Sequence, residues 1–438
     1  MTNYVGFQPR GGRPRQSVKT RLHRGLSAPT LSCLEPYPHK SIIYPHIKEL
    51  YQTKLSNHWL LLRALRDTKV YHYKGSILTM TEPTTTQKIH HIKPSDLESF
   101  VHRVLVANNV PTDHARIISN CLLQADLRGV DTHGTNRIPS YMQRIRQKVL
   151  DPSASPTLTQ ITPIAASIDG KNTFGFVSAQ KGMQRAIEMA SEFGLGLVSI
   201  KHSNHFGMSA WIVQQAIDAG MMSLVFTNSS PALPVWGGKS KLMGVSPIAC
   251  GAPAGKERPF ILDMAPSVAA RGKIYKALRR GEKIPTDWAL DADGNITDDP
   301  ARALEGVMLP MGGPKGSALA VMMDVFSGVF SGSAFAGHVT GPYDPSKPAD
   351  VGHFLLAIKP DLFVSLEEFK ERMDYLYQRV VGSDRMGGVE RVYYPGEIEQ
   401  INKEKRLEEG IPFTEVEIGN LNKEAELVGV AKLEYASE

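Results

Sequence analysis

Helix-like and strand-like patterns alternate twice between residues 178 and 226, and this alternation limits the chain to a mixed fold. Apolar residues recur with a helical period over 178–193 and again over 209–219, and the two runs stop at Gly194 and Gly220. A short apolar run of the kind that forms a buried strand follows each stop. Because helices that alternate with strands pack on a sheet, the sequence predicts an α/β or mixed α+β fold.

Both ends of the chain's body are predicted to be helical. Ser95 and Glu98 have the spacing of a capping box in front of an apolar face, and so do Ser365 and Glu368. The helices expected at the two ends cover residues 95–107, 112–128, 365–381, 396–408 and 421–428. We expect these ends to pack together.

The middle of the body is expected to carry further short elements. These are strands at 260–262 and 353–358, a basic helix at 267–280, a loop at 285–300 and a helix at 316–329. The predicted organisation has three parts: a basic leader of residues 1–79, a helical domain of residues 80–160 plus 360–438, and a central domain of residues 161–359.

Composition excludes several classes of protein. No run of eighteen apolar residues occurs, so the sequence predicts no membrane-spanning helix. The three cysteines, Cys33, Cys121 and Cys250, are odd in number and far apart, which disfavours a disulfide framework and a cysteine-built zinc site. A reducing compartment, the cytoplasm, is the simpler expectation.

The net charge of +6 is unevenly distributed. Residues 1–79 hold 13 Lys or Arg against 3 Asp or Glu, whereas residues 80–438 hold 37 against 41. A mildly acidic body has no electrostatic reason to bind nucleic acid, and only the leader keeps that alternative open. The composition of the leader also leaves mitochondrial targeting as an alternative. The leader contains an amphipathic helix pattern at 46–67, and it is dispensable if translation starts at Met80.

The densest polar cluster runs from Asp131 to Arg137, with Tyr141 beyond it. The guanidinium of Arg137 offers a bidentate fork for a carboxylate, and His133 titrates in the range that suits proton exchange. Pro139 fits the first turn of a helix, which would place these side chains near one another. The competing interpretation is that both residues merely cap helix ends.

Two further clusters precede predicted helices. Residues 201–207 contain His202 and His205, a spacing that also occurs in metal sites, although no third ligand is evident nearby. Residues 309–317 are glycine-rich and place Lys315 at a helix start, but they do not match a P-loop. No G-x-G-x-x-G follows a strand, so an ordinary Rossmann site is disfavoured.

Taken together, the motifs resemble those of the type-2 malate/L-lactate dehydrogenase family, whose relatives include ureidoglycolate, sulfolactate and diketogulonate oxidoreductases and an imine-acid reductase. The resemblance covers about residues 93 to 430. It rests on the ordered motifs ADLRGVDTHGTNRIPSYMQRI, GLVSIKHSNHFGMSAW, FILDMAPS, PTDWALDADGNITDDP, GGPKGSALAVMMDVFSGVFSG, GHFLLAIKPDLF and YYPGEIE followed by GIPF. The family implies a nicotinamide-binding fold unrelated to Rossmann, and a homodimer with active sites in clefts between the cofactor domain and the helical parts.

By position, the resemblance assigns proton transfer to His133 and His205 and substrate contacts to Thr132, Arg137 and Tyr141. It assigns cofactor contacts to Ser229, Asp263, Met264, Ala265, Lys315, Pro395, Gly396 and Glu397, and it implies no metal. Thr132 stands where many members have serine, and Asp324 stands where a glutamate is common. Both changes keep the polar group, so they are expected to alter substrate choice rather than abolish the chemistry.

The resulting hypothesis is an oxidoreductase that uses NAD or NADP to move a hydride to or from C2 of a small 2-hydroxy or 2-keto acid. A cyclic imine-acid reductase of the same family and a non-catalytic descendant are the alternatives within the family. A histidine-metal hydrolase is the alternative outside it. The sequence does not select the acid or the cofactor.

Overall fold

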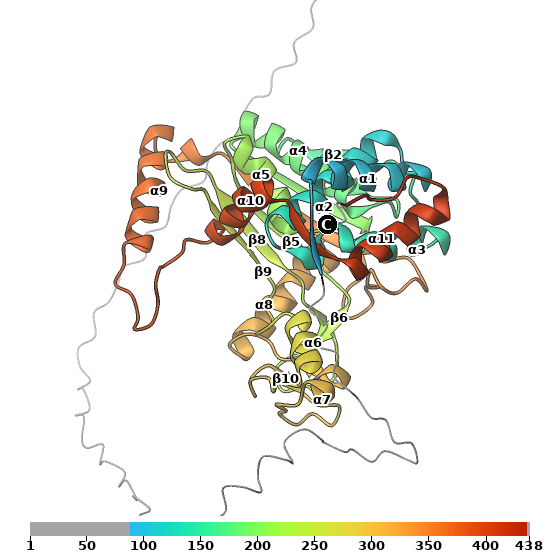
Figure 1. Cartoon of the computed structure of the whole chain (residues 1–438). Helices are drawn as coiled ribbons and strands as arrows, with labels where there is room; N and C mark the ends of the chain where they lie inside the picture. The colour runs from blue at the N-terminus through green and yellow to red at the C-terminus, as the bar shows by residue number, and fades with distance from the viewer. Residues whose placement is uncertain (1–87, 436–438) are drawn as a thin grey trace, which may run out of the picture. The chain divides into compact units, whose positions relative to one another are not determined.

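The computed structural model describes residues 88–435 (Figure 1). The chain divides into two units, Met1–Pro83 and Thr84–Glu438, and everything below concerns the second. The predictions made for the leader, its helix at 46–67 and a start at Met80 lie outside the described residues. No helix among the described residues is long and apolar enough to cross a membrane.

A seven-stranded sheet forms the centre of the described body. Neighbouring strands follow the order β2 (Thr157–Thr162), β3 (Ala165–Asp169), β4 (Leu195–Ser203), β12 (Val351–Ile358), β5 (Met222–Thr227), β8 (Ile248–Ala252) and β9 (Phe260–Met264). Only β3 and β4 run parallel, and every other pair is antiparallel. This arrangement differs from the doubly wound parallel sheet of a Rossmann domain, so the predicted mixed, non-Rossmann fold is confirmed.

Helices cover both faces of the sheet. Alternate residues of β12 divide between the faces: Leu355 joins the core under α4 (Gly175–Phe193) and α5 (Ser209–Asp218), whereas Phe354 packs with Met323 of α8 (Pro314–Asp324). Gly182 allows α4 to approach closely, since a Cβ there would lie 2.7 Å from Leu355. The predicted end of α4 is confirmed at Gly194, which has φ of +86°.

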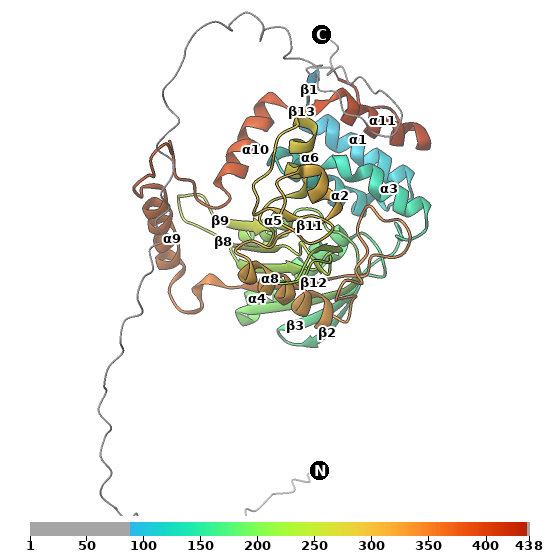
Figure 2. The same cartoon turned by 90° about the horizontal axis from the view of Figure 1, so that it is seen from below.

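The two chain ends form one helical part, as expected, except that the helix predicted at 365–381 lies apart from it. Strand β1 (Ile89–Ile92) pairs antiparallel with β13 (Ile411–Thr414). Around this pair lie the helices α1 (Pro94–Ala107), α2 (Thr112–Leu127), α3 (Ile138–Arg146), α10 (Glu397–Glu409) and α11 (Glu415–Val428). Figures 1 and 2 both show α1, α3 and α11 side by side. Their apolar residues and those of α4 and α5 belong to one continuous core.

Helix caps were predicted with mixed success. Ser365 caps α9 (Leu366–Val381) by accepting a hydrogen bond from the N–H of Glu368, as predicted. The capping box at Ser95 is wrong, because Pro94 already begins α1 and the Ser95 hydroxyl donates to Asp96 instead. The only complete capping box in the described residues is at Thr414, which starts α11 six residues before the expected 421.

A smaller lobe has a core of its own. It contains the pair β6 (Pro231–Leu233) with β7 (Met243–Gly244), the pair β10 (Ala289–Leu290) with β11 (Val307–Met308), and the helices α6 (Arg271–Arg280) and α7 (Pro300–Glu305). Figure 1 shows α6, α7 and β10 gathered together below the sheet. The basic helix begins at residue 271 rather than 267, and the loop expected at 285–300 contains β10 and the first residue of α7. Helix α8 continues as a π-helical turn, Val325–Val329, to the predicted end.

Candidate active site

The loop after α2 is fixed by a buried carboxylate. Two 3-10 turns, Asp131–His133 and Thr135–Arg137, carry the predicted cluster. Between them, the N–H of Thr135 donates to Asp126 at 2.9 Å, and Asp126 is fully buried. A Cβ on Gly134 would lie 1.6 Å from the same carboxylate, so only glycine fits. Asp126 therefore positions both His133 and Arg137.

The structure brings His133, Tyr141 and His205 together from two distant segments. The Tyr141 hydroxyl lies 2.8 Å from Nδ1 of His205, and the imidazole rings of His205 and His133 are stacked with their centroids 5.5 Å apart. The N–H of Gly207 also donates to Nδ1 of His205, at 3.2 Å. Since that N–H can only donate, Nδ1 is an acceptor, and Nε2 is the ring nitrogen left to act on a ligand.

Burial sets the protonation of this group. Burial, with the neighbouring charge of Arg137 as the second cause, lowers the pKa of His133 to about 4 and that of His205 well below its usual value. Burial also raises the pKa of the Tyr141 phenol. At neutral pH both imidazoles are therefore uncharged and Tyr141 is protonated. A ligand carboxylate beside Arg137 would offset its charge and make the imidazoles more basic.

Arg137 is held so that part of its guanidinium stays free. Its Nε donates to the carbonyl of Thr132 at 2.6 Å, and its Cζ lies 4.6 Å from the ring centroid of Tyr343. Among the described residues, no protein acceptor lies within hydrogen-bonding distance of its two Nη atoms. Tyr343 belongs to a loop tied down by the buried Arg144, which donates to the carbonyls of Gly341, Asp344 and Lys347. The free Nη atoms form a fork from which a carboxylate can accept two parallel hydrogen bonds.

A pocket of about 380 Å³ lies between His133, strand β9 and the start of α10. Seven of the predicted site residues line it: Thr132, His133, Asp263, Met264, Ala265, Pro395 and Gly396. The other six, Arg137, Tyr141, His205, Ser229, Lys315 and Glu397, do not. His133 links the two groups, because it lines the pocket and stacks on His205.

Asp263 and the turn before α10 shape the far wall of the pocket. Asp263 accepts a hydrogen bond from the N–H of Ala210, at the start of α5, at 2.7 Å. Its side chain is exposed to the pocket, but the surrounding protein desolvates the carboxylate and raises its pKa to about 6. The carbonyl of Pro395 accepts from the N–H of Ile261 at 3.2 Å. Gly396 has φ of +88° against Ile261, so this turn requires glycine.

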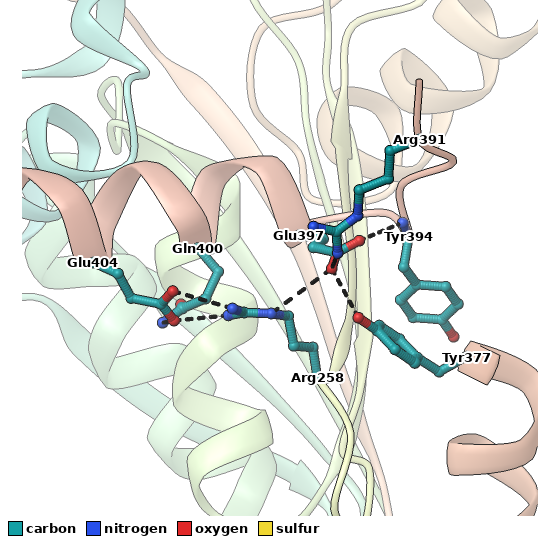
Figure 3. Close-up of polar contacts among 7 residues, drawn as sticks. All are labelled: Arg258, Tyr377, Arg391, Tyr394, Glu397, Gln400 and Glu404. Carbon is teal, nitrogen blue, oxygen red and sulfur yellow. Dashed lines mark hydrogen bonds and ion pairs between the residues drawn. The ribbon is translucent and has the colours of Figure 1, made fainter. Parts of the chain in front are cut away.

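The side chain of Glu397 points away from the pocket into a polar network (Figure 3). Its carboxylate is 1% exposed and accepts hydrogen bonds from the Tyr377 hydroxyl at 2.7 Å, from the Tyr394 N–H at 3.0 Å and from Arg391. Arg258 lies 3.9 Å away and also pairs with Glu404. Burial pushes the pKa of Glu397 upward, but these partners outweigh it and the pKa ends below its usual value. The network anchors the turn that Gly396 forms.

A third histidine, His353, is buried behind the site. His353 of β12 lies between two hydroxyls, with Nδ1 2.7 Å from Thr227 and Nε2 2.8 Å from Ser203. Burial lowers its pKa to about 3. The ring therefore connects the ends of β4 and β5 as a neutral group, and the segments that follow these strands carry His205 and Ser229.

His202 and His205 do not share a centre. His202 lies 3.2 Å from Asp169, whereas His205 contacts Tyr141. Among residues 88–435, no group of three or more His, Cys, Asp or Glu side chains is arranged to hold a metal ion. Lys315 is exposed at the start of α8, and the buried hydroxyl of Ser229 has no hydrogen-bond partner within the described part of the chain.

Three residues of the site were not predicted. Asp126 and Arg128 lie in the motif ADLRGVDTHGTNRIPSYMQRI, just before the cluster that begins at Asp131. This position was the sequence signal that could have identified them. Nothing local marks Tyr343, which lies in the loop before β12, far from Arg137 in the sequence.

The fold and the site define a mixed α/β protein equipped to hold a carboxylate and to exchange a proton beside a long pocket. A family model described as malate/L-lactate dehydrogenase matches residues 92–422. The chain therefore belongs to the malate/L-lactate dehydrogenase family, as the motifs indicated.

Individual relatives agree with this membership. L-sulfolactate dehydrogenase of Methanothermobacter thermautotrophicus is 36% identical over 324 residues, which cover 74% of this chain and 93% of the relative. Malate dehydrogenase of Pyrococcus abyssi is 36% identical and covers 78% and 96%. The solved sulfolactate dehydrogenase of Methanocaldococcus jannaschii superposes with a TM-score of 0.74 at 35% identity, covering 78% of this chain and 98% of that one. The names of other relatives specify NAD(+) in one case and NADP(+) in another.

Proposed function

We propose that this protein is an NAD(P)-dependent dehydrogenase of small 2-hydroxy acids. The observation that carries the proposal is the stacked pair His133 and His205 beside the free guanidinium fork of Arg137, with His133 also lining the pocket that contains Asp263 and Gly396. The names of the relatives support the reaction class, since they are dehydrogenases of malate and sulfolactate.

The residues present suit such a reaction. The Arg137 fork holds the carboxylate beside the reacting carbon and so orients the substrate. One imidazole of His133 and His205 exchanges the proton of the C2 oxygen, while the other orients the ligand. When bound, the nicotinamide supplies or accepts the hydride. Its binding is supported by the pocket that runs from His133 to the glycine turn at Gly396.

The roles can be tested with single variants. His133→Gln and His205→Gln are each expected to lower turnover, and losing the proton-exchanging group costs about 10²–10⁴-fold. Turnover would be followed at the absorbance band of reduced nicotinamide, with a panel of 2-keto and cyclic imino acids and both cofactors. Cofactor fluorescence would show that each variant still binds nicotinamide. Two variants with near-normal turnover on every acid would contradict the proposal.

Arg137→Lys probes the carboxylate fork separately. Lysine keeps the positive charge but cannot make two parallel hydrogen bonds, so the Michaelis constant for the acid should rise while cofactor affinity stays unchanged. An unchanged Michaelis constant would show that Arg137 does not hold the carboxylate.

We further propose that the protein acts as a homodimer. Val325, Phe326, Val329 and Phe330 on the π-helical turn and the residue after it are 37–59% exposed, and so large an apolar surface is typical of an interface. A second copy could also bring Ser229 and Lys315, which do not line the pocket of one chain, toward a shared site. Sedimentation of the full chain at the mass of a monomer would contradict this.

A cytoplasmic location is also proposed. The support is chemical: Cys121 is buried, Cys250 is free, and no disulfide joins them. Mitochondrial targeting by the leader is the alternative, and fractionation of cells that express the full chain would distinguish the two.

A further inference from the structure

Arg128, which follows the last residue of α2, is a buried cation with few partners. Its side chain is 3% exposed and lines the same pocket as His133. Its Nη2 donates to the side-chain oxygen of Gln214 at 2.8 Å, and its Nε is buried without a partner. Among residues 88–435, no carboxylate oxygen lies within 4.0 Å of this guanidinium.

This arrangement is costly without a ligand. A buried charge is normally paired, and an uncompensated one destabilises a fold by several kcal/mol. Two carboxylates share the pocket, Asp263 and Glu399, but neither forms an ion pair with Arg128. Asp263 is instead engaged at the start of α5. An oxyanion from outside the protein would complete the hydrogen bonding of the guanidinium.

We propose that Arg128 is an oxyanion-binding residue of this pocket, which takes either a phosphate of the nicotinamide cofactor or the second acidic group of a dianionic 2-hydroxy acid. The inference rests on the proposed function and adds a recognition point to it. Arg137 holds the carboxylate beside C2 and does not line the pocket. Arg128 lines the pocket and binds a second negatively charged group there. Loss of a charge-assisted contact of this kind weakens binding by about tenfold to 100-fold.

The test compares Arg128→Gln and Arg128→Lys with Arg116→Gln, a control at an exposed arginine of the same helix. Dissociation constants for NADH and NADPH come from cofactor fluorescence, which does not depend on turnover. Michaelis constants for oxaloacetate and pyruvate, which differ in one carboxylate, report on the acid. Thermal melting shows whether each variant is folded. If Arg128→Gln does not fold, the comparison is made with Arg128→Lys alone.

The outcomes distinguish the two sources of the oxyanion. Weaker binding of both cofactors points to their shared diphosphate, and weaker binding of NADPH alone points to its 2′-phosphate. A raised Michaelis constant for oxaloacetate, with pyruvate and both cofactors unchanged, points to the second acidic group. Affinities equal to those of Arg116→Gln throughout would overturn the inference. Wild-type protein that binds neither cofactor would refute the proposed function itself, and the inference with it.

Discussion

Replacing Glu397 by glutamine tests whether this residue supports the pocket or contacts the cofactor directly. The change keeps the shape of the side chain but removes the charge that accepts hydrogen bonds from Tyr377 and Tyr394. Hydrogen bonds to charged groups contribute about 1.5–3 kcal/mol each, and the amide retains one acceptor oxygen. Arg391 and Arg258 are 49% and 31% exposed, so water compensates them in part. We therefore expect Glu397→Gln to lower the free energy of unfolding by about 2–3 kcal/mol.

The matched control is Glu404→Gln, which breaks a surface pair with Arg258 and should cost at most about 1 kcal/mol. Unfolding in urea, followed by circular dichroism at one protein concentration, measures both values. Because the folded-state pKa of Glu397 is depressed, its contribution is present above the unfolded pKa and fades as the pH falls below about 4. A variant as stable as Glu404→Gln with weaker cofactor binding would refute the structural role and restore direct contact.

Two further perturbations test other parts of the site. Gly134→Ala should destabilise the protein by about 1–3 kcal/mol and reduce turnover, because the new Cβ collides with Asp126. Gly272→Ala, which meets nothing within 4 Å, is its control in urea unfolding, and equal costs would show that the loop can yield. His353 stays neutral in the folded state down to about pH 3, whereas an unfolded histidine binds a proton below about pH 6.5. Folding stability should therefore fall by about 2.3 kcal/mol between pH 6.5 and 4.5 through this residue alone. His353→Gln should remove that part of the acid sensitivity, and an unchanged pH profile would count against it.

Local patterns predicted the helices better than the contacts between them. The apolar face of α1 was predicted because burial on one side imposes a period that a single segment displays. Strands β1 and β13 were missed, because each is four residues long and its partner lies at the other end of the chain. The capping box at Ser95 failed for a related reason, since two residues with the right spacing do not show where a helix begins.

In the candidate site, too, local patterns were easier to predict than the contacts between segments. His133, Arg137 and His205 stand in polar clusters before helices, and the sequence displays such clusters directly. That His133 stacks on His205 depends on the packing of α2 and α3 against α4 and β4, which no single segment encodes. Glu397 was expected at the cofactor because the resemblance assigns the whole turn of residues 395–397 to it, yet its side chain turns into the polar network.

The pairing of β1 with β13 has a consequence for synthesis. A growing polypeptide presents α1 and α2 to water long before the ribosome has made Phe413, Ile418 and Leu421, which complete the same core. The early helices can pack on each other and on α4, but the side of the core that β13 and α11 complete stays open until almost the whole chain has emerged. A premature stop before residue 411 would also remove Glu417, which accepts a hydrogen bond from Asn136 in the loop that carries His133.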